Sequence, residues 1–440
     1  MENRKENIQK VVSELETDMD FLCVTGVEDL LQDDVEQTIE NLRNAGMRIW
    51  MLTGDKIETA TCISISAGIK GKNQKIFYIR SDIMKEYSLE KKLKEIEKGL
   101  DKYKQLESNS HILIIDGEIL ELCLNNMERH FFESAMLAPS VVCCRCSPTQ
   151  KSKIVKRIKN YTDKRTAAIG DGGNDVAMIQ EADVGIGIVG KEGLQASLAS
   201  DFSILKFNYL NDLLLWWGRL AYKNTSTMSN FVVHRGMIIS LIQFIFSLMF
   251  YCNAVALYNG MLILGYSTIY TTFPSISVLL DNDTDRTNVV KFPRLYKRLL
   301  LGRELNTKAF LWWFLKSIYQ SAAIMIGSIY LFSDNIFLKI VTVTFTELIF
   351  AELLNVYVEI KKFHKFMIFS LVGTLFTYLL SILLFDYILD VYFIFTISTF
   401  IRILAIALIS WVPFYIINWI RVKLYPEAHE KLNEVKKNEV

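Results

Sequence analysis

The sequence has almost no net charge, and its cysteines and histidines form no complete metal-binding pattern. Its 49 lysines and arginines and 48 aspartates and glutamates leave a formal charge of +1, so no overall positive field favours nucleic acid as a partner. Three of the seven cysteines cluster at Cys143, Cys144 and Cys146, but no second cysteine pair or histidine pair completes a zinc site. We therefore interpret the cluster as reduced thiols on a buried strand.

The first residues, MENRKENIQKVV, are polar and lack the apolar stretch of a secretory signal. Hydrophobic residues reach 51% of the chain although 22% of residues are charged, and the two kinds are unevenly distributed. Charged and apolar segments alternate in the first half, whereas long apolar runs dominate the second. We predict a soluble domain over residues 1–222, a transmembrane domain over 231–420 and a cytosolic tail over 421–440.

Short apolar segments alternate with helical patterns in the soluble part, which predicts an α/β domain with a parallel sheet. The expected strands cover residues 21–26, 48–52, 111–115, 141–145, 165–170 and 183–188, and the clearest helices cover 33–45 and 151–159. A lysine- and glutamate-rich stretch over 71–110 is expected to be a solvated helical insertion without a chemical role.

Two of these strands end in segments that suit phosphate chemistry, because sites in parallel sheets lie beyond the carboxyl ends of the strands. The first segment is TGDK, residues 53–56, where amides at a helix start would favour a phosphate and Thr53 would donate to it. A helix cap is the other interpretation of TGD. The second segment is GDGGND, residues 170–175, whose glycines permit a tight turn. Asp171 and Asp175 then leave the strand close together, and paired carboxylates suit Mg²⁺.

Between these motifs lies CSPTQK, which ends in Lys151. Pro148 and Thr149 are suited to begin the following helix. Lys151 then lies near the helix start, where the helix dipole disfavours a cation. A bound anion would account for that placement, and an ordinary surface lysine is the alternative.

The TGD, the lysine and the GDGGND, in this order, resemble the second, third and fourth motifs of the haloacid dehalogenase superfamily. The longer strings MLTGDKIETA and AIGDGGNDVAMIQEADVGIGI resemble P-type ATPases. Within these, VVCCRCSPTQK and GKEGLQASLASDFSILKF resemble the phospholipid flippases, the type IV class. The resemblance implies a partial haloacid-dehalogenase-like, Rossmann-type phosphorylation domain followed by an α-helical transmembrane bundle.

The resemblance also implies Mg²⁺ and ATP as cofactors. It assigns the metal to Asp171 and Asp175, and the phosphoryl group to Thr53 and Lys151. The residues expected to hold the nucleotide or the phosphoenzyme are Thr53, Gly54, Asp55, Arg145, Lys151, Asn174 and Asp175.

The chain departs from this family in one respect. It contains no DKTGT, the string that carries the phosphorylated aspartate, and no counterpart of the nucleotide-binding domain, the actuator domain or the first four membrane helices. We therefore expect it to match the C-terminal portion of such a pump and to be inactive alone. Asp116 in LIIDGEIL also follows a strand, but it comes after TGD, and a turn aspartate before glycine explains it.

Six apolar stretches have the length of about 20 residues that a bilayer span needs. They cover residues 231–251, 256–280, 309–332, 337–359, 366–385 and 403–420. Basic residues concentrate in the loops 291–308 and 360–365 and in the tail, whereas the other short loops hold only Arg402. This bias predicts that the basic loops, both termini and the soluble domain are cytosolic. The apolar stretch 387–401 is expected to lie in the interface.

Polar residues within the spans are candidates for a transport path. Arg235, near the start of the first span, would either meet an anionic headgroup or anchor the helix at the interface. Asn259, in the second span, is a further candidate for a lipid path. The second span holds no carboxylate, and Pro274 predicts a kink in it. A pump for bare cations is expected to offer carboxylates near mid-membrane, so we favour phospholipid as the substrate.

The stretches FVVHRGMIISLIQ and FPRLYK resemble the flippases of Golgi and endosomal membranes, a subclass that does not require an accessory subunit. The hypothesis is an ATP-driven, multi-pass membrane pump that moves phospholipid from the exoplasmic to the cytosolic leaflet. Two alternatives stay open. One is an ion-transporting P-type ATPase, and the other is a truncated, catalytically inactive relative that binds Mg²⁺ or a partner.

Overall fold

The structure of the chain is a computed structural model. It describes all residues except 1–3, 18, 21, 24–29, 82–88, 107–109, 191–192, 253, 301, 303, 333–335, 386–387, 427, 429 and 432–440. The chain divides into two units, Met1–Asp33 and Asp34–Val440. The first unit contains helix α1 (Arg4–Leu15). The strand expected over 21–26 lies largely outside the described residues.

The second unit begins with an α/β part that contains seven described strands. These are β1 (Ile49–Leu52), β2 (Lys75–Ile79), β3 (His111–Asp116), β4 (Ser140–Cys144), β5 (Ala167–Gly170), β6 (Val184–Ile188) and β7 (Phe202–Ile204). Its helices are α2 (Val35–Asn44), α3 (Ile57–Ser66), α4 (Leu89–Lys104), α5 (Gly117–Asn126), α6 (Glu128–Ala135), α7 (Pro148–Thr162), α8 (Val176–Glu181) and α9 (Gln195–Leu198).

The strands form two parallel sheets, which confirms the predicted strand direction. The larger sheet has the order β1-β4-β3-β2, and the smaller has the order β5-β6-β7. In the larger sheet Cys143 lies beside Leu52 on one side and Ile115 on the other. The carboxyl ends of β1, β4 and β3 therefore meet at one edge.

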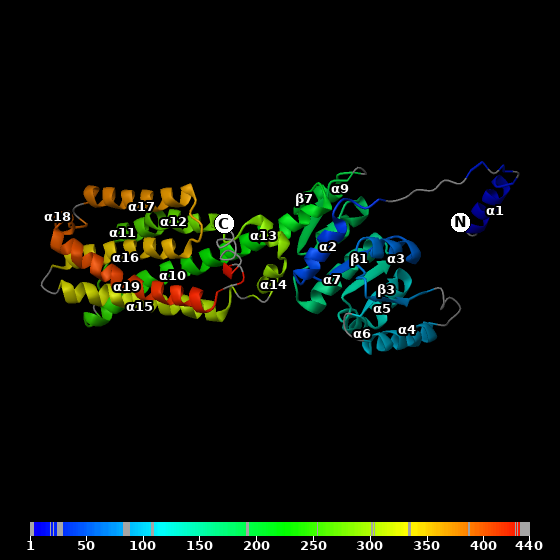
Figure 1. Cartoon of the computed structure of the whole chain (residues 1–440), viewed down its shortest axis with the longest axis horizontal. Helices are drawn as coiled ribbons and strands as arrows, with labels where there is room; N and C mark the ends of the chain where they lie inside the picture. The colour runs from blue at the N-terminus through cyan, green and yellow to red at the C-terminus, as the bar shows by residue number, and fades with distance from the viewer. Residues whose placement is uncertain are drawn as a thin grey trace. The chain divides into compact units, whose positions relative to one another are not determined.

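Both faces of the central strands β3 and β4 are buried, which explains why these two strands are almost continuously apolar. Leu113 and Ile115 of β3 belong to a core formed with α4, α5, α6 and α7. Ile112 and Ile114 of the same strand belong to a core formed with α2 and α3 on the opposite face. Figure 1 shows these helices around the strands.

The expectation of a solvated insertion over 71–110 is wrong. β2 pairs in parallel with β3, and Ile96 and Leu100 of α4 are fully buried against the sheet. The lysines and glutamates mark the outer face of an amphipathic helix, and their number hid the apolar stripe. The short strand β7 was also not expected.

The remainder of the second unit is helical. Its longer helices are α10 (Arg219–Met249), α15 (Thr307–Leu331), α16 (Phe337–Glu359), α17 (Lys365–Leu384) and α19 (Ile397–Leu424). Its shorter helices are α11 (Gly260–Gly265), α12 (Thr272–Ser277), α13 (Arg286–Lys291), α14 (Arg294–Leu300) and α18 (Val391–Ile394). A π-helical segment, Asn211–Gly218, runs directly into α10 and joins the α/β part to this bundle.

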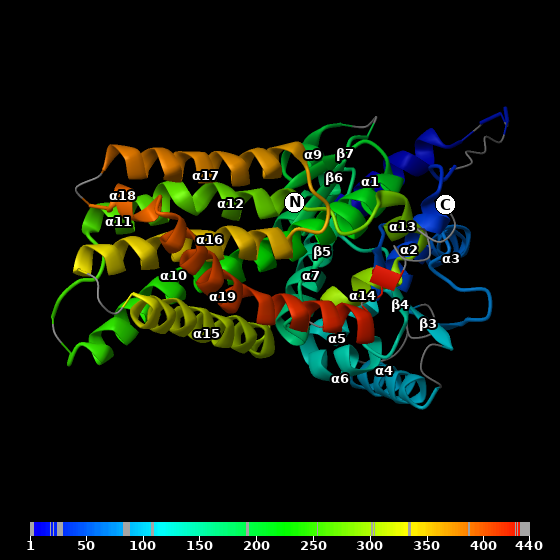
Figure 2. The same cartoon turned by 60° about the vertical axis from the view of Figure 1, so that its left-hand side comes forward.

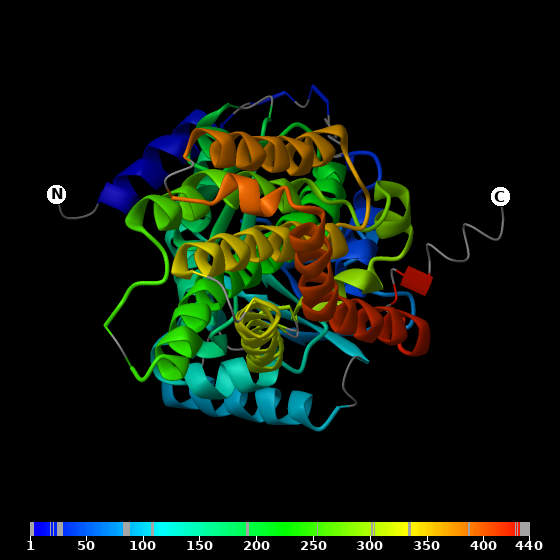
Figure 3. The ribbon, with the colours of Figure 1, turned by 90° about the vertical axis from the view of Figure 1, so that its left-hand side faces the viewer.

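Five helical segments of the described chain are long and apolar enough to cross a membrane: Phe207–Met249, Gly260–Leu280, Thr307–Leu331, Lys365–Leu384 and Ile397–Leu424. Each overlaps one predicted span. The other predicted span, 337–359, coincides with α16, which lies inside the bundle between α15 and α17 in Figures 2 and 3. The stretch 387–401 was expected to lie in the interface, apart from the last span. Its end is part of that span, because α19 already begins at Ile397.

The second predicted span is a broken helix. It consists of α11, a π-helical turn over Tyr266–Tyr270, α12 and a final 3-10 turn. The break falls at Thr271, whose φ of −120° leaves the helical range, three residues before Pro274. The kink predicted from the proline is therefore present, because proline cannot donate the helical hydrogen bond.

Candidate active site

Thr53 follows β1 and is held against the end of β4. Its N–H donates to the Cys143 carbonyl at 3.0 Å, and its carbonyl accepts from the Cys146 N–H at 2.9 Å. The Thr53 hydroxyl donates to Asp55 Oδ2 at 2.6 Å and accepts from the Asp55 N–H at 3.1 Å. Helix α3 then begins with Lys56 as its N-cap and no side-chain capping bond, so the cap interpretation of TGD is wrong.

The end of β4 turns sharply to bring α7 to the same edge. Arg145 has a φ of +50°, an uncommon conformation for a residue with a side chain, and its N–H donates to the Asp55 carbonyl at 2.9 Å. Ser147 and Gln150 then form a capping box, with Pro148 in the first turn of α7. The helix start predicted from Pro148 is confirmed.

Lys151 and Asp175 meet in the structure. The Lys151 Nζ lies 2.8 Å from Asp175 Oδ1, and the two side chains are 11% and 15% exposed. The anion that we expected beside Lys151 is thus supplied, at least in part, by Asp175. The pair joins α7 to the GDGGND segment, so it brings together two of the three motifs of the predicted site.

Gly170 of the GDGGND segment is required by close packing. A Cβ at Gly170 would lie 2.4 Å from the Cβ of Asp175, whereas one at Gly173 would meet only the end of the flexible Gln195 side chain. Asp171 and Asn174 are exposed on the turn that follows β5. The absence of a side chain at Gly170 therefore lets Asp175 fold back over the end of β5.

The carboxylates of Asp171 and Asp175 can supply part of a Mg²⁺ site whose other ligands are phosphate and water oxygens. In the described part of the chain no group of three or more His, Cys, Asp or Glu side chains comes together as a metal site. Asp171 and Asp175 supply carboxylate oxygens, the ligand type that Mg²⁺ prefers, and Mg²⁺ commonly binds through one or two carboxylates together with phosphate and water. The donor set thus suits Mg²⁺ bound with a phosphate.

Asp116 is unlike the exposed carboxylates of this edge. It is fully buried at the end of β3, and its Oδ2 accepts a short hydrogen bond from the hydroxyl of Ser81. A Cβ at the next residue, Gly117, would lie 2.6 Å from the Arg145 carbonyl oxygen, so α5 starts in tight contact with β4. These contacts give Asp116 a structural role, but it is the last residue of β3 and the N-cap of α5 and does not lie in the turn that we expected. No pattern in the sequence pointed to Ser81.

The cysteine cluster agrees with its interpretation as buried thiols. Cys143 and Cys144 lie on β4, and all seven cysteines of the chain are free. Burial raises the pKa of Cys144 to about 12, which keeps this thiol protonated.

The two residues proposed for a lipid path have different surroundings. Arg235 is half-buried and donates to Thr271 Oγ1 at 2.9 Å, at the break in the second span. Asn259 caps α11 by accepting from the Met261 N–H at 3.3 Å. Asn259 therefore has a local structural role, and a contact with lipid stays a prediction for both residues.

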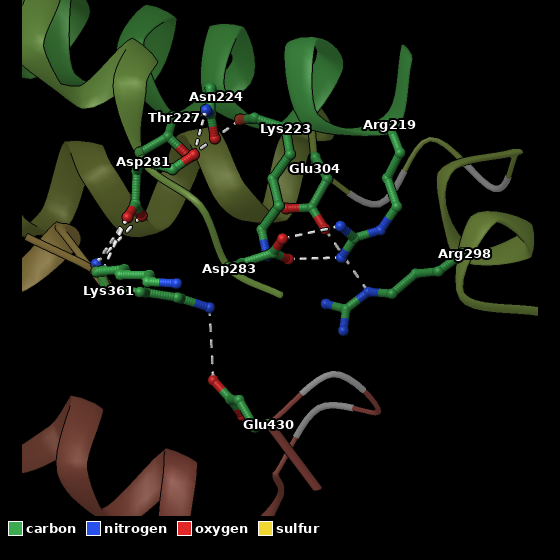
Figure 4. Close-up of polar contacts among 11 residues, drawn as sticks. Arg219, Lys223, Asn224, Thr227, Asp281, Asp283, Arg298, Glu304, Lys361 and Glu430 are labelled. Atoms are coloured by element: carbon green, nitrogen blue, oxygen red, sulfur yellow. Dashed lines mark hydrogen bonds and ion pairs between the residues drawn. The ribbon is translucent and has the colours of Figure 1, made fainter. Parts of the chain in front are cut away.

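A cluster that the sequence did not predict joins the first span to the loops beside it. Arg219 and Lys223 of α10 both point to Asp283 (Figure 4). Asn224 donates to the carbonyls of Leu279 and Asp281. The Asp281 carboxylate in turn accepts from the N–H groups of residues 361 and 362. The only signal in the sequence was the density of charge in DNDTDR.

Comparisons with known proteins agree with both parts of this architecture. The family model described as phospholipid-translocating P-type ATPase C-terminal matches residues 197–427, and that of the haloacid dehalogenase-like hydrolases matches residues 24–191. The chain is 46% identical over 432 residues to the probable phospholipid-transporting ATPase IIB of Danio rerio, covering 98% of this chain and 37% of that protein.

Two further relatives show the same coverage. The probable phospholipid-transporting ATPase IIB of Bos taurus is 44% identical over 434 residues, which are 98% of this chain and 37% of the relative. The phospholipid-transporting ATPase NEO1 of Saccharomyces cerevisiae is 41% identical over 439 residues, which are 99% of this chain and 37% of the relative. The chain thus spans a little over a third of the length of these relatives.

Proposed function

Because the chain belongs to the phospholipid-translocating P-type ATPases, we propose that it forms the C-terminal part of an ATP-driven flippase. In this proposal the complete protein moves phospholipid from the exoplasmic to the cytosolic leaflet. The names of the relatives, which are phospholipid-transporting ATPases, support lipid as the substrate class.

The observation that carries the proposal is that β1 and β5 each lie at the edge of a sheet, with a pairing strand on one side only among the described strands. Among the described strands β1 pairs only with β4, and β5 pairs only with β6. Leu52 of β1 nevertheless packs against a cluster that contains Ala168 of β5 and Val155 of α7, so the two edges lie near one group of side chains. One further parallel strand between them would complete a single sheet, and its carboxyl end would lie between Thr53 and Asp171. A phosphorylated aspartate is expected at that place.

Each residue at this edge then has a role. The Thr53 hydroxyl and the Lys151 ammonium would bind the phosphoryl oxygens, and Asp171 and Asp175 would hold Mg²⁺. Mg²⁺ would neutralise charge on the phosphate oxygens. A bound phosphate would compete with Asp175 for Lys151, whose amine lies 2.8 Å from the carboxylate. The exposed residues Gly54, Asp55, Arg145 and Asn174 would contact the nucleotide or the phosphoenzyme.

The proposal extends to the setting of the pump. The sequence resemblance supports a Golgi or endosomal membrane and transport without an accessory subunit. The bias of basic residues supports a cytosolic location of the α/β part and of both ends of the chain. The helical run from Asn211 through Met249 supports transmission of movements from the active site to the bundle.

A chimera tests the proposed function. The N-terminal part of the Danio rerio relative, which this chain does not cover, would be joined to this chain and reconstituted in vesicles with a fluorescent phospholipid. We expect an acid-stable phosphoenzyme and ATP-dependent lipid movement from the chimera and neither from this chain alone. Asp175→Asn should abolish turnover without loss of expression, because removing one charge weakens the electrostatic clamp on the phosphoryl group.

Glu181→Gln is the matched control, because Glu181 lies in the next helix and pairs with the surface residue Lys156. It should leave turnover unchanged. Wild-type turnover in the Asp175→Asn chimera would end the metal assignment. A phosphorylated chimera that moves no lipid would end the transport proposal while leaving the active site in place.

A further inference from the structure

A chain of hydrogen bonds runs through the core of the helical bundle. His234 of α10 is fully buried, with its Nδ1 2.6 Å from Ser317 Oγ and its Nε2 3.1 Å from Asn355 Nδ2. Glu352, which precedes Asn355 on α16, lies 3.9 Å from the same His234 Nε2. Tyr266, in the π-helical turn of the broken span, reaches Glu352 Oε1 at 3.2 Å.

The hydrogen-bond pattern defines the protonation of His234. The Ser317 hydroxyl donates to the Trp313 carbonyl at 2.9 Å, so Ser317 Oγ accepts from His234 Nδ1–H. On the other side, the amides of Asn355 and Gln320 exchange two bonds, of 2.9 and 3.1 Å, which orients the Asn355 NH₂ group toward Nε2. An NH₂ group only donates, so Nε2 accepts and the imidazole is neutral.

Counting the hydrogen-bond donors around Tyr266 likewise indicates that Glu352 carries a proton. A tyrosine hydroxyl has one proton to donate. Tyr266 Oη lies 2.9 Å from the Arg235 carbonyl and 3.2 Å from Glu352 Oε1, and a carbonyl can only accept. The Tyr266 proton therefore belongs to the shorter bond with Arg235. The contact with Glu352 becomes a second full hydrogen bond, instead of a proton shared between two acceptors, when the carboxyl group is protonated and donates to Tyr266 Oη.

Burial favours the same protonation. Glu352 is 2% exposed, and its Oε2 has no hydrogen-bond partner among the residues that the structure describes. An ionised carboxylate with a free oxygen is strongly disfavoured in such a place, whereas the neutral acid satisfies its single donor. A metal cation is a poor alternative, because the positive charges of Arg235 and Lys316 already act on this group.

We propose that Glu352, with Tyr266 as its acceptor and His234 as a neighbouring base, is a proton-binding site in the core of the bundle. The titratable or charged groups that face it are Tyr266 from the broken span, His234 and Arg235 from α10, and Lys316 from α15. Lys316 is buried and pairs with Glu359 at 3.8 Å, so its charge has its own partner.

The hydrogen bond of Glu352 depends on where the broken span places Tyr266. Tyr266 begins the π-helical turn just before the break at Thr271, and π-helical turns are often functional positions in helices. When this turn moves away, the carboxyl O–H loses its acceptor. The inference does not depend on the proposed lipid transport.

Infrared spectroscopy of the full chain in lipid nanodiscs tests the site. A protonated carboxyl has a C=O stretch distinct from that of a carboxylate, and it shifts in D₂O. At neutral pH we expect Glu352→Gln to remove one such band and Tyr266→Phe to shift it. Glu347→Gln is the matched comparison, because Glu347 is a buried carboxyl on the same helix with no contact to Tyr266 among the described residues.

The double variants make the assignment specific. The shift caused by Tyr266→Phe should persist in the Glu347→Gln background and disappear in the Glu352→Gln background. A shift that survives in Glu352→Gln, or a band that Glu352→Gln leaves intact, overturns the proposal. Where Glu352→Gln fails to fold, Tyr266→Phe alone decides, since an unchanged carboxyl spectrum in that variant also overturns it.

Discussion

Arg219 and Asp283 form a bidentate ion pair in which both side chains are almost completely buried. The guanidinium nitrogens lie 2.8 and 2.5 Å from the two carboxylate oxygens, and the side chains are 5% and 3% exposed (Figure 4). Lys223, one turn farther along α10, adds a third charge at 2.7 Å. The start of the first span is therefore held to the segment that follows the second.

The pKa of Asp283 depends on the neighbouring side chains of Arg219 and Lys223. Burial alone would raise the pKa of Asp283, but hydrogen bonds from Arg219 and the charge of Lys223 outweigh it and hold the pKa well below its usual range. The stability that this carboxylate contributes is therefore fully present above the unfolded pKa of about 3.9. It is lost progressively as the pH falls below that value, and the loss is complete once the pH has fallen through the lower, folded pKa.

We predict that Asp283→Asn destabilises the chain by about 3–5 kcal/mol, because it removes the buried carboxylate that Arg219 and Lys223 share. Asp285→Asn is the matched control, since Asp285 is 45% exposed and pairs with Lys362 at 3.6 Å, and its loss should cost about 0–1 kcal/mol. Thermal unfolding of the purified chain in nanodiscs measures both. Equal midpoints for the two variants would contradict the central role of Asp283.

A second prediction concerns the turn after β5. In Gly170→Ala the new methyl group would meet the Cβ of Asp175 at 2.4 Å and push that side chain from Lys151. Such overpacking costs about 1–3 kcal/mol. Hydrogen exchange at the β5 and β6 amides measures the local loss of stability.

The control for this variant is Gly99→Ala in α4, where the methyl group meets nothing within 4 Å. It should stabilise its helix by roughly 0.5–1 kcal/mol, because alanine has less backbone freedom to lose. Faster exchange in both variants to the same degree would show that glycine at 170 is not required by packing.

A third prediction tests whether α4 belongs to the core. Leu100 is fully buried between α4 and the sheet, so Leu100→Ala should destabilise this part by about 2–5 kcal/mol. Exposed Glu97 on the same helix provides the control, and Glu97→Ala should change stability by no more than about 0.5 kcal/mol. Hydrogen exchange at the β2 and β3 amides distinguishes the two variants. Unchanged exchange rates in Leu100→Ala would restore the interpretation of residues 71–110 as a solvated insertion.

The fourth prediction concerns topology. The loop around Lys297, in α14, carries the densest basic cluster and should face the cytosol. The loop around Asp334, which lies outside the described residues, carries no basic residue and should face the lumen. A glycosylation acceptor in an extended loop at Asp334 should be modified in microsomes, and one at Lys297 should not. Modification at Lys297 would reverse the predicted topology and remove the proposed active site from cytosolic ATP.

Local patterns in the sequence determined much of the fold. The apolar segments of β1, β3, β4, β5 and β6, the helix start at Pro148, the break near Pro274 and most of the long helices follow from periodicity, turn chemistry and length. These features depend on neighbours in the chain, so their physical causes are visible in the sequence. The order of the TGD, lysine and GDGGND motifs likewise carried the resemblance to the haloacid dehalogenase superfamily, whose family model matches residues 24–191.

Contacts between distant residues were decided only by the tertiary structure. The pairing of β2 with β3 turned a charged stretch into part of the sheet. The expectation that the second span offers no carboxylate holds for its own residues, yet Glu352 of α16 reaches Tyr266 within it. Lys151 meets Asp175, and Arg219 meets Asp283, across 24 and 64 positions of sequence. Such pairs depend on how helices and strands pack, and packing is a property of the whole chain that no local pattern contains.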